Sequence, residues 1–123
     1  MVVANDAVTK RAYMLVHQVS RIGSAGLVVT CHDATRFPKL AGIDSEGRAL
    51  SETEGNRYAA GTFDRILADV PCSGDGTLRK NHDLWRTFGL QHAHTLHPTQ
   101  VQIAMRGAAL LAVGGRMVYS TVR

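Results

Sequence analysis

Hydrophobic and polar positions alternate along the chain between short apolar runs and helical patterns. Apolar runs rich in valine, leucine and isoleucine predict strands buried in a parallel sheet, at residues 1–4, 27–31, 66–68 and 116–120. Apolar residues at helical spacing predict helices at residues 7–21 and 99–112. The order of these elements predicts an α/β fold with a parallel sheet.

The predicted helices carry start and stop signals at their ends. Asn5-Asp6 offers a cap to the first helix, and Asp83 can cap a further short one. Pro98 is expected to open the helix 99–112, and Gly114-Gly115 to end it.

A carboxylate follows three of the predicted strands, at Asp6, Asp33 and Asp69. The carboxyl ends of parallel strands lie along one edge of a sheet, where carboxylates can accept hydrogen bonds from ribose hydroxyls or an amino group. Taken singly, Asp6 is more simply a helix cap. Jointly, the three acids favour a ligand that contains a nucleoside.

The loop after Asp69 has the composition of an active-site loop. Pro71 stiffens the exit from the strand, and Gly74 and Gly76 permit backbone angles that larger residues avoid. Such a loop can hold Cys72 in a fixed place. The alternative is a strand, a turn and a buried cysteine that packs as a small hydrophobic residue.

Length and composition allow one hydrophobic core, because the chain has 123 residues of which 45% are hydrophobic. We therefore expect residues 1–123 to be one domain or part of one. The segment 41–61 is rich in glycine, serine and charge with little periodicity, and is predicted to be a surface insertion.

The net charge of +4 is compatible with nucleic acid, and most of the basic residues are arginine. Arg79 and Lys80 lie close to Cys72 in the sequence and are candidate phosphate contacts, or else a solvated basic pair. His92, His94 and His97 invite a metal site, but neither a fourth ligand nor a neighbouring acid is evident, so no metal is predicted.

The two cysteines form no disulfide framework, and free thiols fit a reducing intracellular compartment. The chain has no signal segment and no apolar run long enough to span a bilayer. We expect a soluble protein of the nucleus or cytoplasm with no membrane partner.

Several motifs in order resemble the Nop2/Sun (RsmB-related) RNA cytosine-C5 methyltransferases, and within them the eukaryotic branch that methylates tRNA. The resemblance covers nearly the whole chain outside 41–61. The segments that carry it are Ala4-Asn5-Asp6, His32-Asp33-Ala34, Asp69-Val70-Pro71-Cys72-Ser73-Gly74-Asp75-Gly76, Arg79-Lys80-Asn81 and Gly114-Gly115-Arg116-Met117-Val118-Tyr119-Ser120-Thr121.

The resemblance implies a Rossmann-like methyltransferase sheet, S-adenosylmethionine as cofactor and RNA, chiefly tRNA, as substrate. The acids that match Asp6 and Asp33 hold the ribose and adenine of the cofactor, and the acid that matches Asp69 lies near the methyl donor and the target base. In the family one thiolate adds to C6 of cytosine, and a second cysteine, matched by Cys72, assists release of the adduct.

The sequence departs from the family at the position of the attacking thiol. The family has Thr-Cys-Ser after its later strand, whereas Val122 stands at the cysteine position here and has no thiol. The glycine-rich cofactor loop, the first strand and the C-terminal strands of the family's sheet are also not matched. We therefore expect a partial catalytic domain that is inactive alone.

In the family's sheet, as the resemblance implies, the missing first strand lies between the strands that match those ending at Ala4 and Ala68. We expect those two strands to pair directly, or the chain to self-associate through exposed strand edges, or the fold to be marginally stable. Two other functions remain open, namely a noncatalytic module that binds RNA or cofactor, and a nonfunctional remnant.

Overall fold

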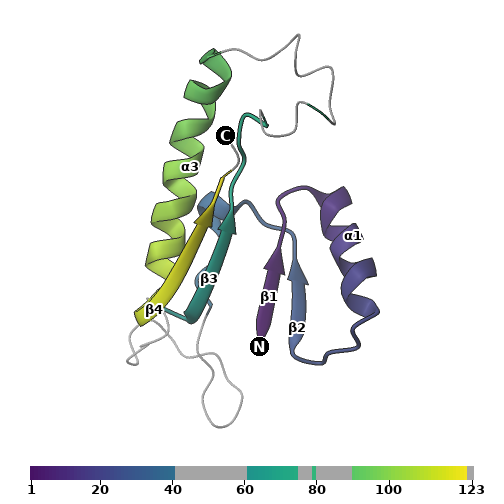
Figure 1. Cartoon of the computed structure of the whole chain (residues 1–123). Coiled ribbons are helices and arrows are strands. Elements are labelled where there is room, and N and C mark those ends of the chain that lie inside the picture. Colours follow the sequence, from purple (N-terminus) through teal and green to yellow (C-terminus); the bar gives the residue numbers. More distant parts are fainter. Residues whose placement is uncertain (41–60, 75–78, 80–89, 122–123) are drawn as a thin grey trace. The chain divides into compact units, whose positions relative to one another are not determined.

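A computed structural model describes residues 1–40, 61–74, 79 and 90–121, and the chain divides into two compact units, Met1–Pro38 and Lys39–Arg123. The predicted α/β class is confirmed. The insertion 41–61 and the cap at Asp83 fall almost entirely outside the described residues. Figure 1 shows the elements in chain order, which are β1 (Val2–Asn5), α1 (Thr9–Ser20), β2 (Leu27–Thr30), η1 (Ala34–Arg36), β3 (Phe63–Asp69), α3 (Leu90–Leu110) and β4 (Leu111–Ser120).

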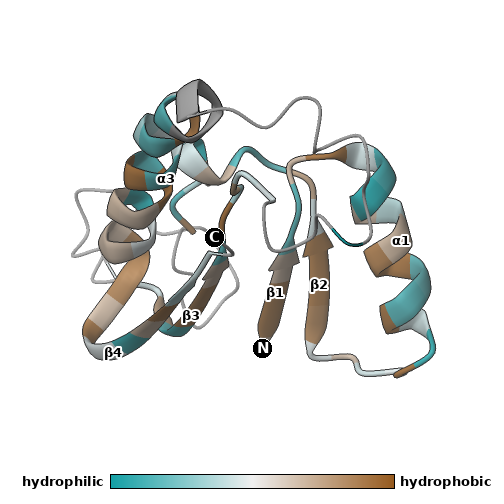
Figure 2. Cartoon of the chain, turned by 45° about the horizontal axis from the view of Figure 1, so that its top comes forward, coloured by the Kyte–Doolittle hydropathy of each residue, from teal (hydrophilic) through white to brown (hydrophobic). Residues whose placement is uncertain are grey.

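The first unit is a strand, helix, strand crossover. β1 and β2 pair in parallel, with register from Val2 opposite Leu27 to Asn5 opposite Thr30. Figure 2 shows hydrophobic residues along both strands, as expected for strands that form the inner layer of a sheet. α1 packs on β2 with Ala12 buried. The first two strands and the first helix were thus predicted with small errors at their ends.

The start of α1 differs from the prediction in its detail. The helix begins at Thr9, and the residue before it, Val8, makes no side-chain cap. Asp6 instead accepts a hydrogen bond at 2.8 Å from the backbone N–H of Val8, the residue immediately before the helix. Asp6 therefore holds the turn that leads into the helix, without being its cap residue.

The second unit pairs β3 with β4 in parallel and packs α3 on one face of that pair (Figure 1). Gly107 of α3 allows a close approach, because a Cβ built there would lie 2.9 Å from Cε of Met117 on β4. The side chain of Ile66 on β3 lies on the same side, 3.9 Å from that position. These contacts hold α3 against the strand pair, and the buried hydrophobic residues among those described in the unit are Val70 and Leu110.

The prediction that the central strand is covered on both faces was wrong for the described part of the chain. Leu67 is 74% exposed and Val118 on the neighbouring strand is 60% exposed. Successive side chains of a strand point to opposite faces, and α3 covers only the face that holds Ile66. The apolar run is typical of a strand in a sheet that is covered on both faces, and among the described residues of this unit only α3 covers a face.

The second helix begins earlier than predicted, because α3 starts at Leu90 and Pro98 lies inside it. Proline removes one backbone donor, so the carbonyl of His94 loses its helical partner. Both Pro98 and His94 are exposed, and water can satisfy that carbonyl. Proline at this position was therefore no reliable marker of the helix start.

The glycine pair was also misassigned, since α3 ends at Leu110 and Gly114-Gly115 lie within β4. Leu111 pairs with Phe63, and the ladder resumes with Arg116 opposite Arg65, so β4 carries the extra residues of a bulge. Gly114 has a φ of +81°, which suits glycine in a bulge as well as after a helix.

The strands that end near Ala4 and Ala68 belong to different units, where β1 pairs with β2 and β3 pairs with β4. Direct pairing of those two strands, one of three outcomes expected from the sequence, stays a prediction. Self-association and marginal stability remain predictions.

Candidate functional site

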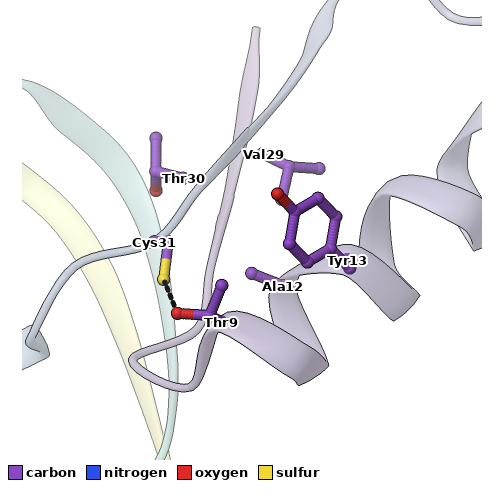
Figure 3. A pocket seen from close by; sticks show the side chains of 6 residues that line it. All are labelled: Thr9, Ala12, Tyr13, Val29, Thr30 and Cys31. Carbon is purple, nitrogen blue, oxygen red and sulfur yellow. Dashed lines mark hydrogen bonds between the residues drawn. The ribbon is translucent and has the colours of Figure 1, made fainter.

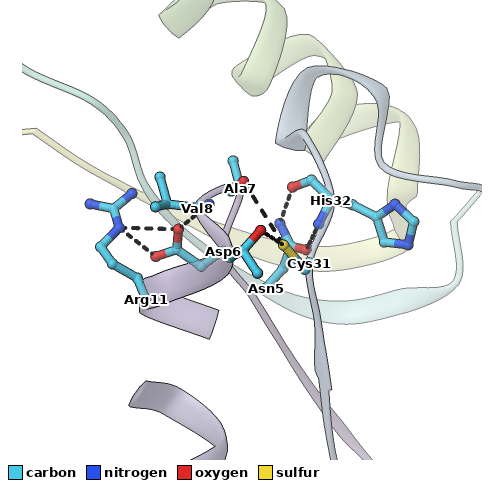
Figure 4. Close-up of polar contacts among 8 residues, drawn as sticks. Asn5, Asp6, Ala7, Val8, Arg11, Cys31 and His32 are labelled. Carbon is cyan, nitrogen blue, oxygen red and sulfur yellow. Dashed lines mark hydrogen bonds and ion pairs between the residues drawn. The ribbon is translucent and has the colours of Figure 1, made fainter. Parts of the chain in front are cut away.

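Asp6 lies directly after β1, where the sequence predicted a strand-end acid (Figure 4). Its carboxylate pairs with Arg11, whose Nε lies 3.0 Å from Oδ2, and Oδ1 accepts the N–H of Val8. The Asp6 side chain is 19% exposed and that of Arg11 is 65% exposed. A carboxylate has about four acceptor positions, so Oδ2 keeps room for a further donor.

Asn5 joins the ends of β1 and β2 through its side-chain amide (Figure 4). Its Oδ1 accepts hydrogen bonds from the Thr30 hydroxyl at 2.9 Å and the His32 N–H at 3.0 Å. Its Nδ2 donates to the His32 carbonyl at 2.9 Å. The amide thus uses both its donor and its acceptor to fix the backbone just before Asp33.

Asp33 lies after β2 and caps the 3₁₀ turn η1. Its Oδ1 accepts from the Thr35 N–H at 2.9 Å and the Thr35 hydroxyl at 2.8 Å. These bonds, the backbone one first, together with the charge of Arg36, hold the pKa of Asp33 below its usual value. The carboxylate is therefore ionised at neutral pH. Asp33 is also exposed to solvent, and both hydrogen bonds from Thr35 go to Oδ1 and not to Oδ2.

The ring of His32 packs edge-on against Phe37, with 5.8 Å between ring centroids. Phe37 is buried, at 8% exposure, and so anchors the far side of the η1 turn. Together with the Asn5 amide, this contact fixes both ends of the segment that carries Asp33.

A hollow of about 160 Å³ lies between α1 and β2, and Figure 3 shows the residues that line it. Cys31 lies at its edge, with Sγ 3.7 Å from the Thr9 hydroxyl. The residues that line the hollow include no carboxylate to accept a hydrogen bond from a ribose hydroxyl. The hollow is therefore not the nucleoside site predicted around Asp6 and Asp33. The residues around it are Thr9, Ala12, Tyr13, Val29, Thr30 and Cys31.

β3 ends at Asp69, which is exposed and lies opposite Ser120 of β4. Val70 is buried at 4% exposure, and its N–H donates to the Ser120 carbonyl at 3.1 Å. Cys72 is half-buried, so the alternative of a buried cysteine that packs as a small hydrophobic residue stays open. Gly74 has a φ of +75°, the conformational freedom predicted for it.

The other predicted site residues are placed only in part. Asp6 and Asp33 lie at adjacent strand ends of the first unit, whereas Asp69 belongs to the second, and a joint site of three acids stays a prediction. Arg79 is exposed. Lys80 and Val122 lie outside the described residues, so their roles also stay predictions.

Sequence reasoning missed the contacts of three side chains that support these positions. Arg11 pairs with Asp6, Asn5 ties β1 to the Asp33 segment, and Gln100 of α3 donates to the Pro71 carbonyl at 2.8 Å. A polar residue at the end of an apolar strand was a usable signal for Asn5. Gln100 gave no such signal, because its partner lies 29 residues away.

Within the described part of the chain, no three His, Cys, Asp or Glu residues come together as metal ligands. The side chain of His92 falls outside that part. None of the described helices combines the length and apolar character that a membrane span requires.

The family model of the 16S rRNA methyltransferase RsmB/F matches residues 1–123. The multisite-specific tRNA:(cytosine-C(5))-methyltransferase trm4b of Schizosaccharomyces pombe is 50% identical over 122 residues, which are 98% of this chain and 18% of that protein. The tRNA (cytosine(34)-C(5))-methyltransferase of Drosophila melanogaster is 50% identical over 121 residues, 98% of this chain and 15% of that protein. The chain therefore spans less than a fifth of these relatives.

The crystal structure of PH0851 superposes with a TM-score of 0.72 at 24% identity, covering 95% of this chain and 23% of that one. This likeness confirms the fold, a part of a larger α/β sheet. Because the family model matches the chain along residues 1–123, the chain belongs to the RsmB/F family of methyltransferases.

Proposed function

We propose that this chain is part of the catalytic domain of an RNA cytosine-C5 methyltransferase that acts on tRNA and uses S-adenosylmethionine. The observation that carries the proposal is the family match over residues 1–123, within which Asp6 and Asp33 end adjacent parallel strands. The tRNA methyltransferases of fission yeast and fruit fly, each 50% identical to this chain, support tRNA as the substrate.

The two acids of the first unit fit the cofactor by their chemistry. Asp33 is exposed and ionised, and Asp6 retains acceptor capacity beside Arg11, so both can accept from ribose hydroxyls or an amino group. When bound, S-adenosylmethionine supplies the methyl group. Asp69, exposed at the end of β3, is the third acid of the proposed site.

Cytosine C5 is a weak nucleophile, and addition of a thiolate to C6 makes it reactive enough to take a methyl group. A base then removes the C5 proton, and the thiolate leaves C6 with the bonding electron pair. We assign Cys72 to this release step. The attacking thiol would stand at Val122, so the chain itself should not transfer a methyl group to RNA.

A chimera tests this assignment in a complete enzyme. This chain would replace the matching 122 residues of the fission yeast relative, with either Val122 or Val122→Cys. We expect no incorporation of labelled methyl into tRNA with Val122 and measurable incorporation with Val122→Cys. Activity with Val122 in place, or a folded Val122→Cys chimera that stays inactive, contradicts the assignment.

The second candidate is a noncatalytic module that binds cofactor or RNA, favoured by the exposed, ionised Asp33 and the exposed Arg79. Calorimetry with S-adenosylmethionine and filter binding with tRNA test this candidate on the chain itself. In the cell, such a module would act in the nucleus or cytoplasm. The control is Asp64→Asn, an exposed acid on β3. Absence of binding to both ligands refutes this candidate.

Self-association through exposed strand edges is part of the proposal, and the exposed Leu67 and Val118, on neighbouring strands of one sheet, add an apolar face that it would bury. Sedimentation equilibrium should show mass rising with concentration, and Leu67→Thr should weaken that rise. A monomer mass at all concentrations contradicts this part alone.

A further inference from the structure

Gln100 links the middle of α3 to the loop that carries Cys72. Its Nε2 donates to the Pro71 carbonyl at 2.8 Å, and the Gln100 side chain is half-buried. A carbonyl can only accept a hydrogen bond, so the amide must present its nitrogen to Pro71. The contact is therefore specific for a side chain with a donor.

The same loop is anchored from its other side by β4. The Val70 N–H donates to the Ser120 carbonyl at 3.1 Å, and the Val70 side chain is buried. Pro71 has no N–H, so its carbonyl is its one backbone hydrogen-bonding group. The loop thus has a strand contact at Val70 and a helix contact at Pro71, immediately before Cys72.

The contact acts on Cys72 through the peptide plane. The Pro71 carbonyl and the Cys72 N–H belong to one planar peptide group, so a hydrogen bond to that carbonyl fixes the plane from which Cys72 departs. We propose that Gln100 is a positioning residue that sets the place of the Cys72 thiol. Its importance for methyl transfer rests on the proposed role of Cys72, but its effect on the thiol does not.

The reactivity of the thiol tests the inference on the whole 123-residue chain. Gln100→Met keeps length and helix preference but removes the donor. Gln102→Met is the matched control, at an exposed position of the same helix. Alkylation by iodoacetamide would be followed at Cys72 by peptide mass spectrometry across pH 7–10, with Cys31 in the same molecule as reference.

Loss of one neutral, exposed hydrogen bond, counted at about 0.5 kcal/mol, should raise the plateau alkylation rate of Cys72 at high pH by about 2-fold. The plateau reports access to the thiolate, so a change in thiol pKa alone would not produce this result. Gln102→Met should leave the rate unchanged, and Cys31 should react alike in all proteins.

Hydrogen exchange of the β3–β4 ladder shows whether the second unit stays folded. Equal Cys72 rates in Gln100→Met and Gln102→Met overturn the inference. So does faster ladder exchange in Gln100→Met, because Gln100 would then support the whole unit and not the loop. The assay contains neither RNA nor cofactor, so its failure and the failure of the proposed function are distinguishable.

Discussion

The Asn5 amide offers the sharpest test of how the first unit places Asp33. Asn5→Ala removes three hydrogen bonds, to the Thr30 hydroxyl, the His32 N–H and the His32 carbonyl. The Thr30 bond is partly buried, and both His32 bonds are exposed, so water replaces the latter at small cost. Counting about 1 kcal/mol for the first and about 0.5 kcal/mol for each of the others predicts a loss of about 2 kcal/mol.

Hydrogen exchange of the β1–β2 amides measures this loss, because a change of about 2 kcal/mol makes exchange about 30-fold faster. The His32 amide should be affected most, since Asn5 is its acceptor. Gln18→Ala, at an exposed position of α1, is the control. Equal exchange in Asn5→Ala and Gln18→Ala would refute the view that Asn5 holds the Asp33 segment.

Two further predictions concern one acid and one glycine. Thr35 and Arg36 lower the pKa of Asp33 in the folded state, so the ionised carboxylate stabilises the folded chain at any pH above the unfolded pKa. This contribution to the free energy of unfolding is lost as the carboxylate becomes protonated below about pH 4. The Thr35 amide shift should follow that titration by NMR, and a pH-independent shift or an unchanged titration in Asp33→Asn would disprove it. Gly107→Ala should stabilise by up to about 1 kcal/mol in urea denaturation, because the flexible end of Met117 can move from the new methyl group, whereas Gly107→Leu should destabilise by about 1–3 kcal/mol. Equal effects of the two substitutions would contradict that packing.

The elements that the sequence predicted well are those whose signal is local. Short apolar runs predicted β1 and β2, and the place of Asp6 and Asp33 directly after those runs predicted that they lie at the strand ends. The expected cofactor and reaction came from the resemblance to a family, because the spacing of apolar residues carries no information about either. The local pattern thus predicted the first unit and the place of its acids.

The errors arose where one residue type serves two purposes. Pro98 is compatible with a helix start and with the exposed side of a helix interior. Gly114 provides a positive φ for a bulge as readily as for a helix end. The contact of Gln100 could not be predicted because it joins segments far apart in the chain.

The central claim is that Cys72 releases a covalent adduct whose attacking thiol would stand at position 122. In the fission yeast chimera with Val122→Cys, Cys72→Ala should accumulate a covalent complex with tRNA, seen as a slower band on a denaturing gel. Cys31→Ala, which removes the exposed thiol of the first unit, is the control and should accumulate none. A Cys72→Ala chimera that turns over without a trapped complex would contradict the account.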